Sequence, residues 1–133
     1  MRQSHSISHL VFDVLPTSSR QFAFFNVSRN CLLARTAYLA GTSKSRRKGL
    51  LGVSAFEEGR GLWIVPCEAI HTFGMKLPID SVFLGKNLQV RDVRSGLKPR
   101  RIAVCLRAHS VLELPAGTVL RSGTQIGDIL QIQ

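Results

Sequence analysis

The amino-acid sequence predicts an α+β fold, in which a compact and mainly antiparallel β-sheet curls toward a barrel beside one or two short helices. Apolar residues come in short runs that Gly or Pro interrupts, which is typical of strands. Residues 79–93 have the pattern of a β-hairpin, and only short stretches near Thr42 and Thr118 have helical character. We therefore expect roughly five to seven short strands.

Length and charge define the class of protein further. A chain of 133 residues forms one domain, large enough to bury a core without disulfide or metal staples. The composition excludes collagen-like, disordered and disulfide-scaffold proteins. Eighteen Lys and Arg against eight Asp and Glu give a formal charge of +10, which favours an acidic partner or surface.

The cysteines and the first residues indicate the compartment. Cys31, Cys67 and Cys105 are odd in number and widely spaced, which suits a reducing environment. Asp13 and Pro16 interrupt the region where a signal peptide needs an apolar stretch. No apolar run approaches the roughly 20 residues that span a bilayer. The sequence therefore predicts a cytoplasmic protein without a transmembrane segment.

Residues 1–25 differ from the rest of the chain, because they are rich in Ser and lack regular alternation. We expect a loosely ordered N-terminal extension, followed by a single globular domain over residues 26–133. Phe22, Phe24 and Phe25 either dock on that domain or contact a partner.

The first elements of the domain lie between residues 30 and 52. Residues 30–34 and 36–40 are expected to form two short strands or one long bent strand. Thr42 or Ser43 can cap a helix that runs through Leu51 and stops at Gly52. The basic residues of this helix would lie near its start, where the helix dipole opposes them. We therefore expect them to be solvated.

The middle of the chain predicts a strand, an irregular segment and a hairpin. Residues 62–65 follow a Gly-rich turn, and Pro66 ends this strand. Residues 67–78 show no period of 2 or 3.6 and are expected to be irregular. The hairpin joins strands over residues 79–84 and 88–93 through a turn at 85–87.

The last third of the chain adds two strands and a helical turn. Residues 95–99 are expected to form a loop, and 111–114 a strand that Pro115 stops. Residues 118–122 predict one helical turn, and 129–132 a closing strand.

Several segments together resemble a known family. They are Arg47-Lys48-Gly49-Leu50-Leu51-Gly52, the block from Ile70-His71-Thr72-Phe73-Gly74-Met75 to Pro78-Ile79-Asp80-Ser81-Val82-Phe83-Leu84, Val111-Leu112-Glu113-Leu114-Pro115-Ala116-Gly117, and Gly127-Asp128. In order and spacing, residues 28–133 resemble the domain of unknown function number 192. This resemblance implies a single mostly β domain of bacteria and archaea, found alone or fused to other modules and sometimes exported. It implies no activity, and residues 1–25 have no counterpart in it.

The irregular segment is the strongest candidate for a ligand site, since rigid sheets often hold functional groups on loops. His71 can hydrogen-bond or accept a proton near neutral pH, and Asp80 can fix its tautomer. We favour the simpler interpretation, in which Thr72 and Asp80 only serve backbone amides and His71 hydrogen-bonds beneath the sheet. Glu113, alone in an apolar strand, either pairs with Arg101 or Arg47 or faces the same pocket as His71. The candidate ligand-binding residues are Cys67, His71, Thr72, Met75, Asp80 and Glu113.

Cysteine and histidine occur twice with the same spacing of four residues, as Cys67 with His71 and as Cys105 with His109. Both residue types are common zinc ligands. Neither pair has the spacing of a zinc knuckle, and residues four apart on a strand lie roughly 13 Å apart. A packed thiol explains each cysteine more simply. We therefore expect no metal and no cofactor, unless loops bring the two pairs together.

Two basic clusters give the alternative function. They could contact the phosphates of a nucleic acid if they lie on one face, although interleaved aromatic residues are missing. The candidate phosphate-contacting residues are Lys44, Arg46, Arg47, Lys48, Arg100 and Arg101, with Arg107 nearby.

The sequence therefore favours a small non-enzymatic domain that binds a ligand or a protein through residues 71–80. Nucleic-acid binding through the basic clusters is the alternative, and a hydrolase that uses His71 with Asp80 or Cys67 is a weaker one. The motifs of nucleotide hydrolysis, dinucleotide binding and two common hydrolase classes are absent. The sequence leaves the ligand and the oligomeric state open.

Overall fold

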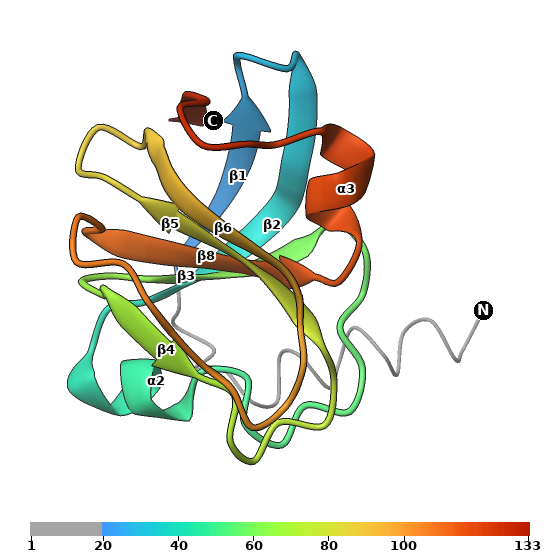
Figure 1. The fold of residues 1–133 in the computed structure, drawn as a ribbon, viewed down its shortest axis with the longest axis vertical. Helices are drawn as coiled ribbons and strands as arrows, with labels where there is room; N and C mark the ends of the chain where they lie inside the picture. The colour runs from blue at the N-terminus through green and yellow to red at the C-terminus, as the bar shows by residue number, and fades with distance from the viewer. Residues whose placement is uncertain (1–19) are drawn as a thin grey trace.

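The computed structural model describes residues 20–133, which form a strongly curled sheet with two short helices at its margins (Figure 1). The sheet has seven strands in the order β6-β5-β8-β3-β2-β1-β9, and β4 and β7 form a separate two-stranded sheet. The elements are β1 (Gln21–Asn26), β2 (Cys31–Ala40), α2 (Ser43–Lys48), β3 (Arg60–Ile64), β4 (Ala69–His71), β5 (Ile79–Leu84), β6 (Val90–Leu97), β7 (Ile102–Val104), β8 (Ser110–Pro115), α3 (Thr118–Ser122) and β9 (Leu130–Ile132).

The pairing of the strands confirms the predicted α+β class with a mainly antiparallel sheet. Only β2 and β3 run parallel, and every other pair of neighbours is antiparallel. The nine strands of the described residues exceed the predicted five to seven. Two of the additional strands, β4 and β7, have three residues each, too few to produce a readable alternation.

Two apolar clusters hold the sheet, one on each face. Along β8, Val111 packs into the cluster around Tyr38 and Phe83, whereas Leu112 and Leu114 pack into the cluster around Phe24. Every residue of β5 and β8 is buried, so the middle of the sheet is covered on both sides. Full burial of one such side chain contributes about 1.5–3 kcal/mol.

The N-terminal boundary differs from the prediction, because residues 21–25 belong to the sheet. Phe24 is fully buried, and the rings of Phe22 and Phe24 meet the Trp63 ring edge-to-face at 5.3 and 5.2 Å between centroids. Strand β1 also pairs with β9, and Ala23 and Gln133 exchange backbone hydrogen bonds. Phe24 is therefore a core residue, Phe22 packs against the same cluster, and Phe25 is half-buried. Residues 1–19 of the predicted extension lie outside the described residues.

Helix α2 begins as predicted and ends earlier than predicted. Thr42 and Ser45 form a reciprocal capping box, and Gly49, with φ of +46°, ends the helix. Because the helix has only six residues, Arg46, Arg47 and Lys48 occupy its last turn, where the dipole favours cations. The expectation that these charges oppose the dipole is therefore wrong.

The remaining predictions agree with the structure to different degrees. Residues 31–40 form one long strand, and the hairpin, the strand ended by Pro115 and the helical turn at 118–122 are confirmed. Strand β6 continues to Leu97, so the predicted loop at 95–99 begins later. No helix of residues 20–133 combines the length and apolar character that a membrane crossing requires.

Candidate functional site

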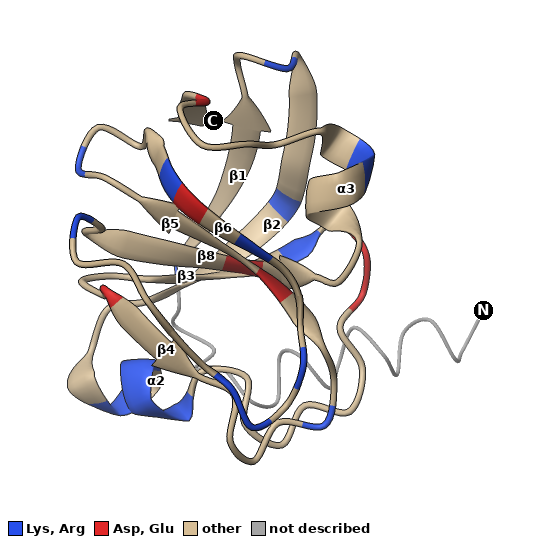
Figure 2. Ribbon diagram, in the orientation of Figure 1, with Lys and Arg blue, Asp and Glu red and all other residues tan. Residues whose placement is uncertain are grey.

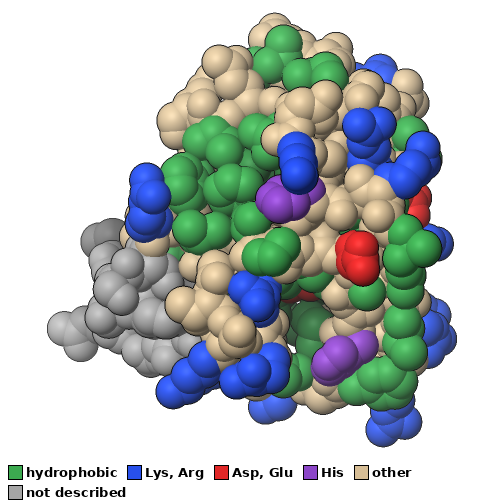
Figure 3. Space-filling model, turned by 90° about the vertical axis from the view of Figure 1, so that its left-hand side faces the viewer, with side chains coloured by type: hydrophobic (Ala, Val, Ile, Leu, Met, Phe, Trp, Pro, Cys, Tyr) green, Lys and Arg blue, Asp and Glu red, His purple; other side chains and the backbone are tan. Residues whose placement is uncertain are grey.

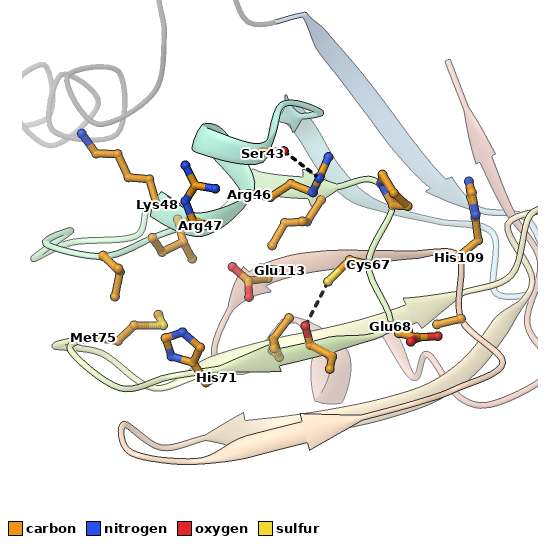
Figure 4. A pocket seen from close by; sticks show the side chains of 18 residues that line it. Ser43, Arg46, Arg47, Lys48, Cys67, Glu68, His71, Met75, His109 and Glu113 are labelled. Carbon is orange, nitrogen blue, oxygen red and sulfur yellow. Dashed lines mark hydrogen bonds between the residues drawn. The ribbon is translucent and has the colours of Figure 1, made fainter.

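A cavity of about 740 Å³ opens between α2, β4 and the face of the large sheet. On the face shown in Figure 3, the surface is hollowed among basic and histidine side chains. Figure 4 shows α2 on one side of this pocket, β4 on the other and Glu113 between them. The lining residues are Ser43, Arg46, Arg47, Lys48, Gly49, Leu50, Leu51, Ile64, Pro66, Cys67, Glu68, Ala69, Ile70, His71, Met75, Ala108, His109 and Glu113.

Glu113 lies deepest among the charged residues of this pocket. It stands on β8 opposite Leu62 of β3 and Ser81 of β5, on the same face as Val111. Its side chain makes no hydrogen bond or ion pair with any residue in 20–133, and the residue is only 3% exposed. Burial raises its pKa to about 7. The predicted pairing with Arg101 or Arg47 is absent from the described structure, and Glu113 faces the pocket that His71 lines.

Ser81 lies next to Glu113 on the same face of the sheet, although it does not line the pocket. Its hydroxyl is buried and has no hydrogen-bond partner among the described residues. Directly opposed residues of antiparallel strands have Cβ atoms about 5 Å apart, so Ser81 and Glu113 are neighbours on the sheet. The sequence reasoning missed Ser81. Its signal was the alternation of β5, which puts Ser81 on one face with the core residues Ile79 and Phe83.

Cys67 is a thiol at the wall of the pocket. Its Sγ donates to the carbonyl oxygen of Ala69 at 3.2 Å. Burial raises the pKa of this thiol most, the charge of Glu113 raises it further, and Arg46 lowers it. A raised pKa keeps the sulfur protonated, whereas nucleophilic cysteines need a lowered one.

The structure brings only part of the predicted segment into the pocket. His71 and Met75 line it, and the His71 ring also lies 5.9 Å from the Phe73 ring. Thr72 and Asp80 do not line it. His71 and Asp80 share no hydrogen bond, because Asp80 turns toward the opposite face of β5 and the segment that leads into α3.

Asp80 and Thr72 instead serve the backbone. The Asp80 carboxylate is fully buried and accepts from the amides of Gly96 (2.7 Å), Gly117 (3.1 Å) and Val119 (2.8 Å). The Thr72 hydroxyl accepts from the amide of Arg101 at 2.8 Å and donates to the carbonyl of Lys98 at 2.6 Å. Both side chains fix loops around the pocket.

Replacing Thr72 by Val should lower the free energy of unfolding by about 1–3 kcal/mol, because it leaves the Arg101 amide and the Lys98 carbonyl without this partner. Urea denaturation measures the loss. The exposed Ser95, changed to Ala, serves as the control and should stay within about 0.5 kcal/mol of the parent. Equal stability of the Thr72 variant and the parent would contradict the backbone role.

The two basic clusters differ in their relation to the pocket. Arg46, Arg47 and Lys48 line it, whereas Lys44, Arg100 and Arg101 do not. Figure 2 places α2 and the turn between β6 and β7 toward the same end of the molecule. Arg46 is held by the Gly41 carbonyl at 2.9 Å and by the Ser43 hydroxyl at 3.3 Å. Arg47 is exposed and its side chain makes no hydrogen bond or ion pair with residues 20–133, so it can meet a ligand.

The cysteine and histidine pairs do not converge. Within the described part of the chain, no three or more His, Cys, Asp or Glu side chains form a group that could hold a metal ion. Cys67, His71 and His109 all line the pocket, but Cys105 is buried in the apolar cluster.

Comparisons with known proteins identify relatives of the same shape. The family model described as "Uncharacterized ACR" matches residues 25–132. A crystal structure from Sinorhizobium meliloti 1021, described only provisionally as a transcription regulator, has a TM-score of 0.76 at 24% identity and covers 86% of this chain and 94% of its own. A protein of unknown function from Novosphingobium aromaticivorans DSM 12444 has a TM-score of 0.75 at 20% identity, covering 88% of this chain and 89% of its own. No curated protein matches. These likenesses support the fold.

Proposed function

The chain belongs to the domain of unknown function family 192, which supplies a fold without an activity, and we therefore propose a function from the pocket itself: a small non-enzymatic domain that binds an anion with an apolar body. The loop predicted from the sequence contributes His71 and Met75 to this site.

The pocket's lining carries the proposal. Ligand sites in proteins usually have volumes of about 300–1,000 Å³, apolar walls and a few polar groups that orient the ligand. This cavity has a volume of about 740 Å³ and combines apolar side chains such as Leu51, Ile70 and Met75 with the cations of α2. Apolar walls accept a hydrocarbon body, and the cations favour an anionic group.

The charge of the whole chain supports the same class of ligand. A formal charge of +10 raises the local concentration of anions around the molecule. In the pocket this field is focused by Arg46, Arg47 and Lys48, which come from a single turn of α2.

Binding without catalysis agrees with the state of the reactive groups. The Cys67 thiol has a raised pKa and donates to a carbonyl, and Asp80 is fully engaged by backbone amides. A hydrolase of the predicted kind needs a nucleophile within hydrogen-bond reach of a base. His71 has no such pairing with Asp80 among the described residues.

The test is a titration followed by two-dimensional NMR of the amides, with caproate as the probe. We expect shifts confined to residues around the pocket. Arg47→Gln should weaken caproate binding roughly tenfold, because one charge-assisted contact is lost. Lys86→Gln, in the exposed turn between β5 and β6, is the matched control and should bind like the parent.

Two outcomes would contradict the proposal. Caproate shifts spread over the whole surface, or none at all, would remove the pocket as an anion site. A short oligonucleotide that binds at low salt, is released at high salt and involves Arg100 and Arg101 would favour the nucleic-acid hypothesis.

A further inference from the structure

Glu113 is a buried carboxylate without a partner, which is rare in folded proteins. Buried acidic side chains are almost always paired, because the loss of hydration is costly. Yet the residue is 3% exposed and makes no hydrogen bond or ion pair with residues 20–133. It also lines the pocket, so a molecule that enters can reach it.

The three nearest cations of the pocket do not neutralise it. Arg46 points its guanidinium at Gly41 and Ser43, and neither Arg47 nor Lys48 forms an ion pair with Glu113. Figure 4 shows these three side chains along the α2 wall and Glu113 below them, toward the sheet. The pocket therefore has cations on one wall and an acceptor on another.

Ser81 lies beside Glu113 on the same face of the sheet, although it does not itself line the pocket. Its buried hydroxyl, opposite Glu113 on the neighbouring strand, has no partner among the described residues either. Glu113 is the member of this pair that lines the pocket, so it is the group to which a ligand can supply the missing hydrogen bonds.

We propose that Glu113 determines the specificity of the pocket, and that the ligand is a small zwitterion whose amino group donates to Glu113 while its anionic group meets the cations of α2. This inference rests on the proposed function and names the ligand class of the same site. An ammonium group supplies the opposite charge and several N–H donors at once, which is what an unpaired buried carboxylate lacks.

A metal ion fits this pocket less well than an amine. Metal sites for hard or borderline cations gather several ligands, and of the two acidic residues that line the pocket, Glu113 is buried and Glu68 is exposed. The described residues contain no group of three or more metal-ligating side chains. An amine needs only one carboxylate.

Matched pairs of probes test the proposal: γ-aminobutyrate against butyrate, and ε-aminocaproate against caproate. The two members of a pair differ only in the amino group, and two lengths cover different separations between α2 and Glu113. Dissociation constants come from amide NMR titrations of the full chain at pH 8. We expect at least one amino compound to bind about tenfold more tightly than its unsubstituted partner.

The variant Glu113→Gln should abolish this preference by weakening the binding of the amino compound. Glu113→Asp, which keeps the charge and shortens the side chain, should retain part of it. Glu58→Gln is the control, because Glu58 is an exposed carboxylate outside the pocket. It should keep the full preference.

The results separate the two proposals. If caproate and its amino derivative bind equally well to the parent, the zwitterion is excluded while the anion pocket stands. The same holds if Glu113→Gln keeps the preference for the amine. If none of the four probes binds in the pocket, both proposals fail.

Discussion

Replacing Asp80 by Ala should destabilise the domain by about 4 kcal/mol or more, a large part of the stability of an ordinary domain. The substitution leaves the amides of Gly96, Gly117 and Val119 without their acceptor in a fully buried site. Hydrogen bonds to a charged group contribute about 1.5–3 kcal/mol each, and a buried donor left unpaired costs about 1–3 kcal/mol. The free energy of unfolding in urea measures the effect.

Two further variants make this result interpretable. Asp80→Asn keeps one acceptor oxygen and should fall between the parent and Asp80→Ala, which provides a measurement if the Ala variant does not fold. Asp92→Ala removes a half-buried carboxylate of the same hairpin, where it pairs with Arg94 at 3.0 Å. Such a pair contributes about 0–1 kcal/mol. An Asp80→Ala variant as stable as Asp92→Ala would show that Asp80 does not anchor these loops.

Between pH 4.5 and pH 7, the parent should lose about 3 kcal/mol of stability relative to Glu113→Gln. The pKa of Glu113 is raised from 4.5 to about 7 in the folded state by burial. Over this range the unfolded chain releases the proton while the folded chain keeps it. The stability of the parent relative to Glu113→Gln is therefore highest below pH 4.5 and decreases until the pH passes 7. The decrease is about 1.4 kcal/mol for each unit of pKa shift.

The comparison is made by urea denaturation of both proteins at pH 4, 5, 6, 7 and 8. The other titratable side chains of the pocket are common to both proteins, so their contributions cancel in the difference. Parallel pH profiles for the two proteins would mean that Glu113 is as well solvated in the folded chain as in the unfolded chain.

The parts of the fold that sequence predicted are those with local signals. Pro115 ends a strand because proline lacks an amide, and the apolar runs around the turn at 85–87 define a hairpin without reference to the rest of the chain. Strand β7 has a different origin. Ile102 and Val104 are exposed and only Ala103 is buried. Strand β7 therefore forms because it pairs with β4, and no local sequence pattern predicts that pairing.

The candidate site shows the same division. Residue type alone identified His71, Cys67, Met75 and Glu113 as candidates, and all four line one pocket. Of the two roles expected for Asp80, beside His71 or with backbone amides, the structure has the second, since alternation along β5 puts its side chain on the opposite face from Ser81. The meeting of α2 with Glu113, which are far apart in the sequence, follows from the parallel pairing of β2 with β3 and the curl of the sheet.

The pairing of β1 with β9 determines how the domain yields to mechanical force. The N-terminal end of β1 and the C-terminal end of β9 lie at the same end of their ladder, where Ala23 and Gln133 exchange hydrogen bonds. Tension between these two points loads the backbone hydrogen bonds of the antiparallel pair one after another. The β1–β9 pair then separates from this end at low force, because its hydrogen bonds break one at a time. If the two strands were instead pulled in opposite directions along their axes, all of these hydrogen bonds would bear the force together. The pocket between α2 and β4 lies outside that first opening, so a pulled chain can release β9 while the pocket is still closed.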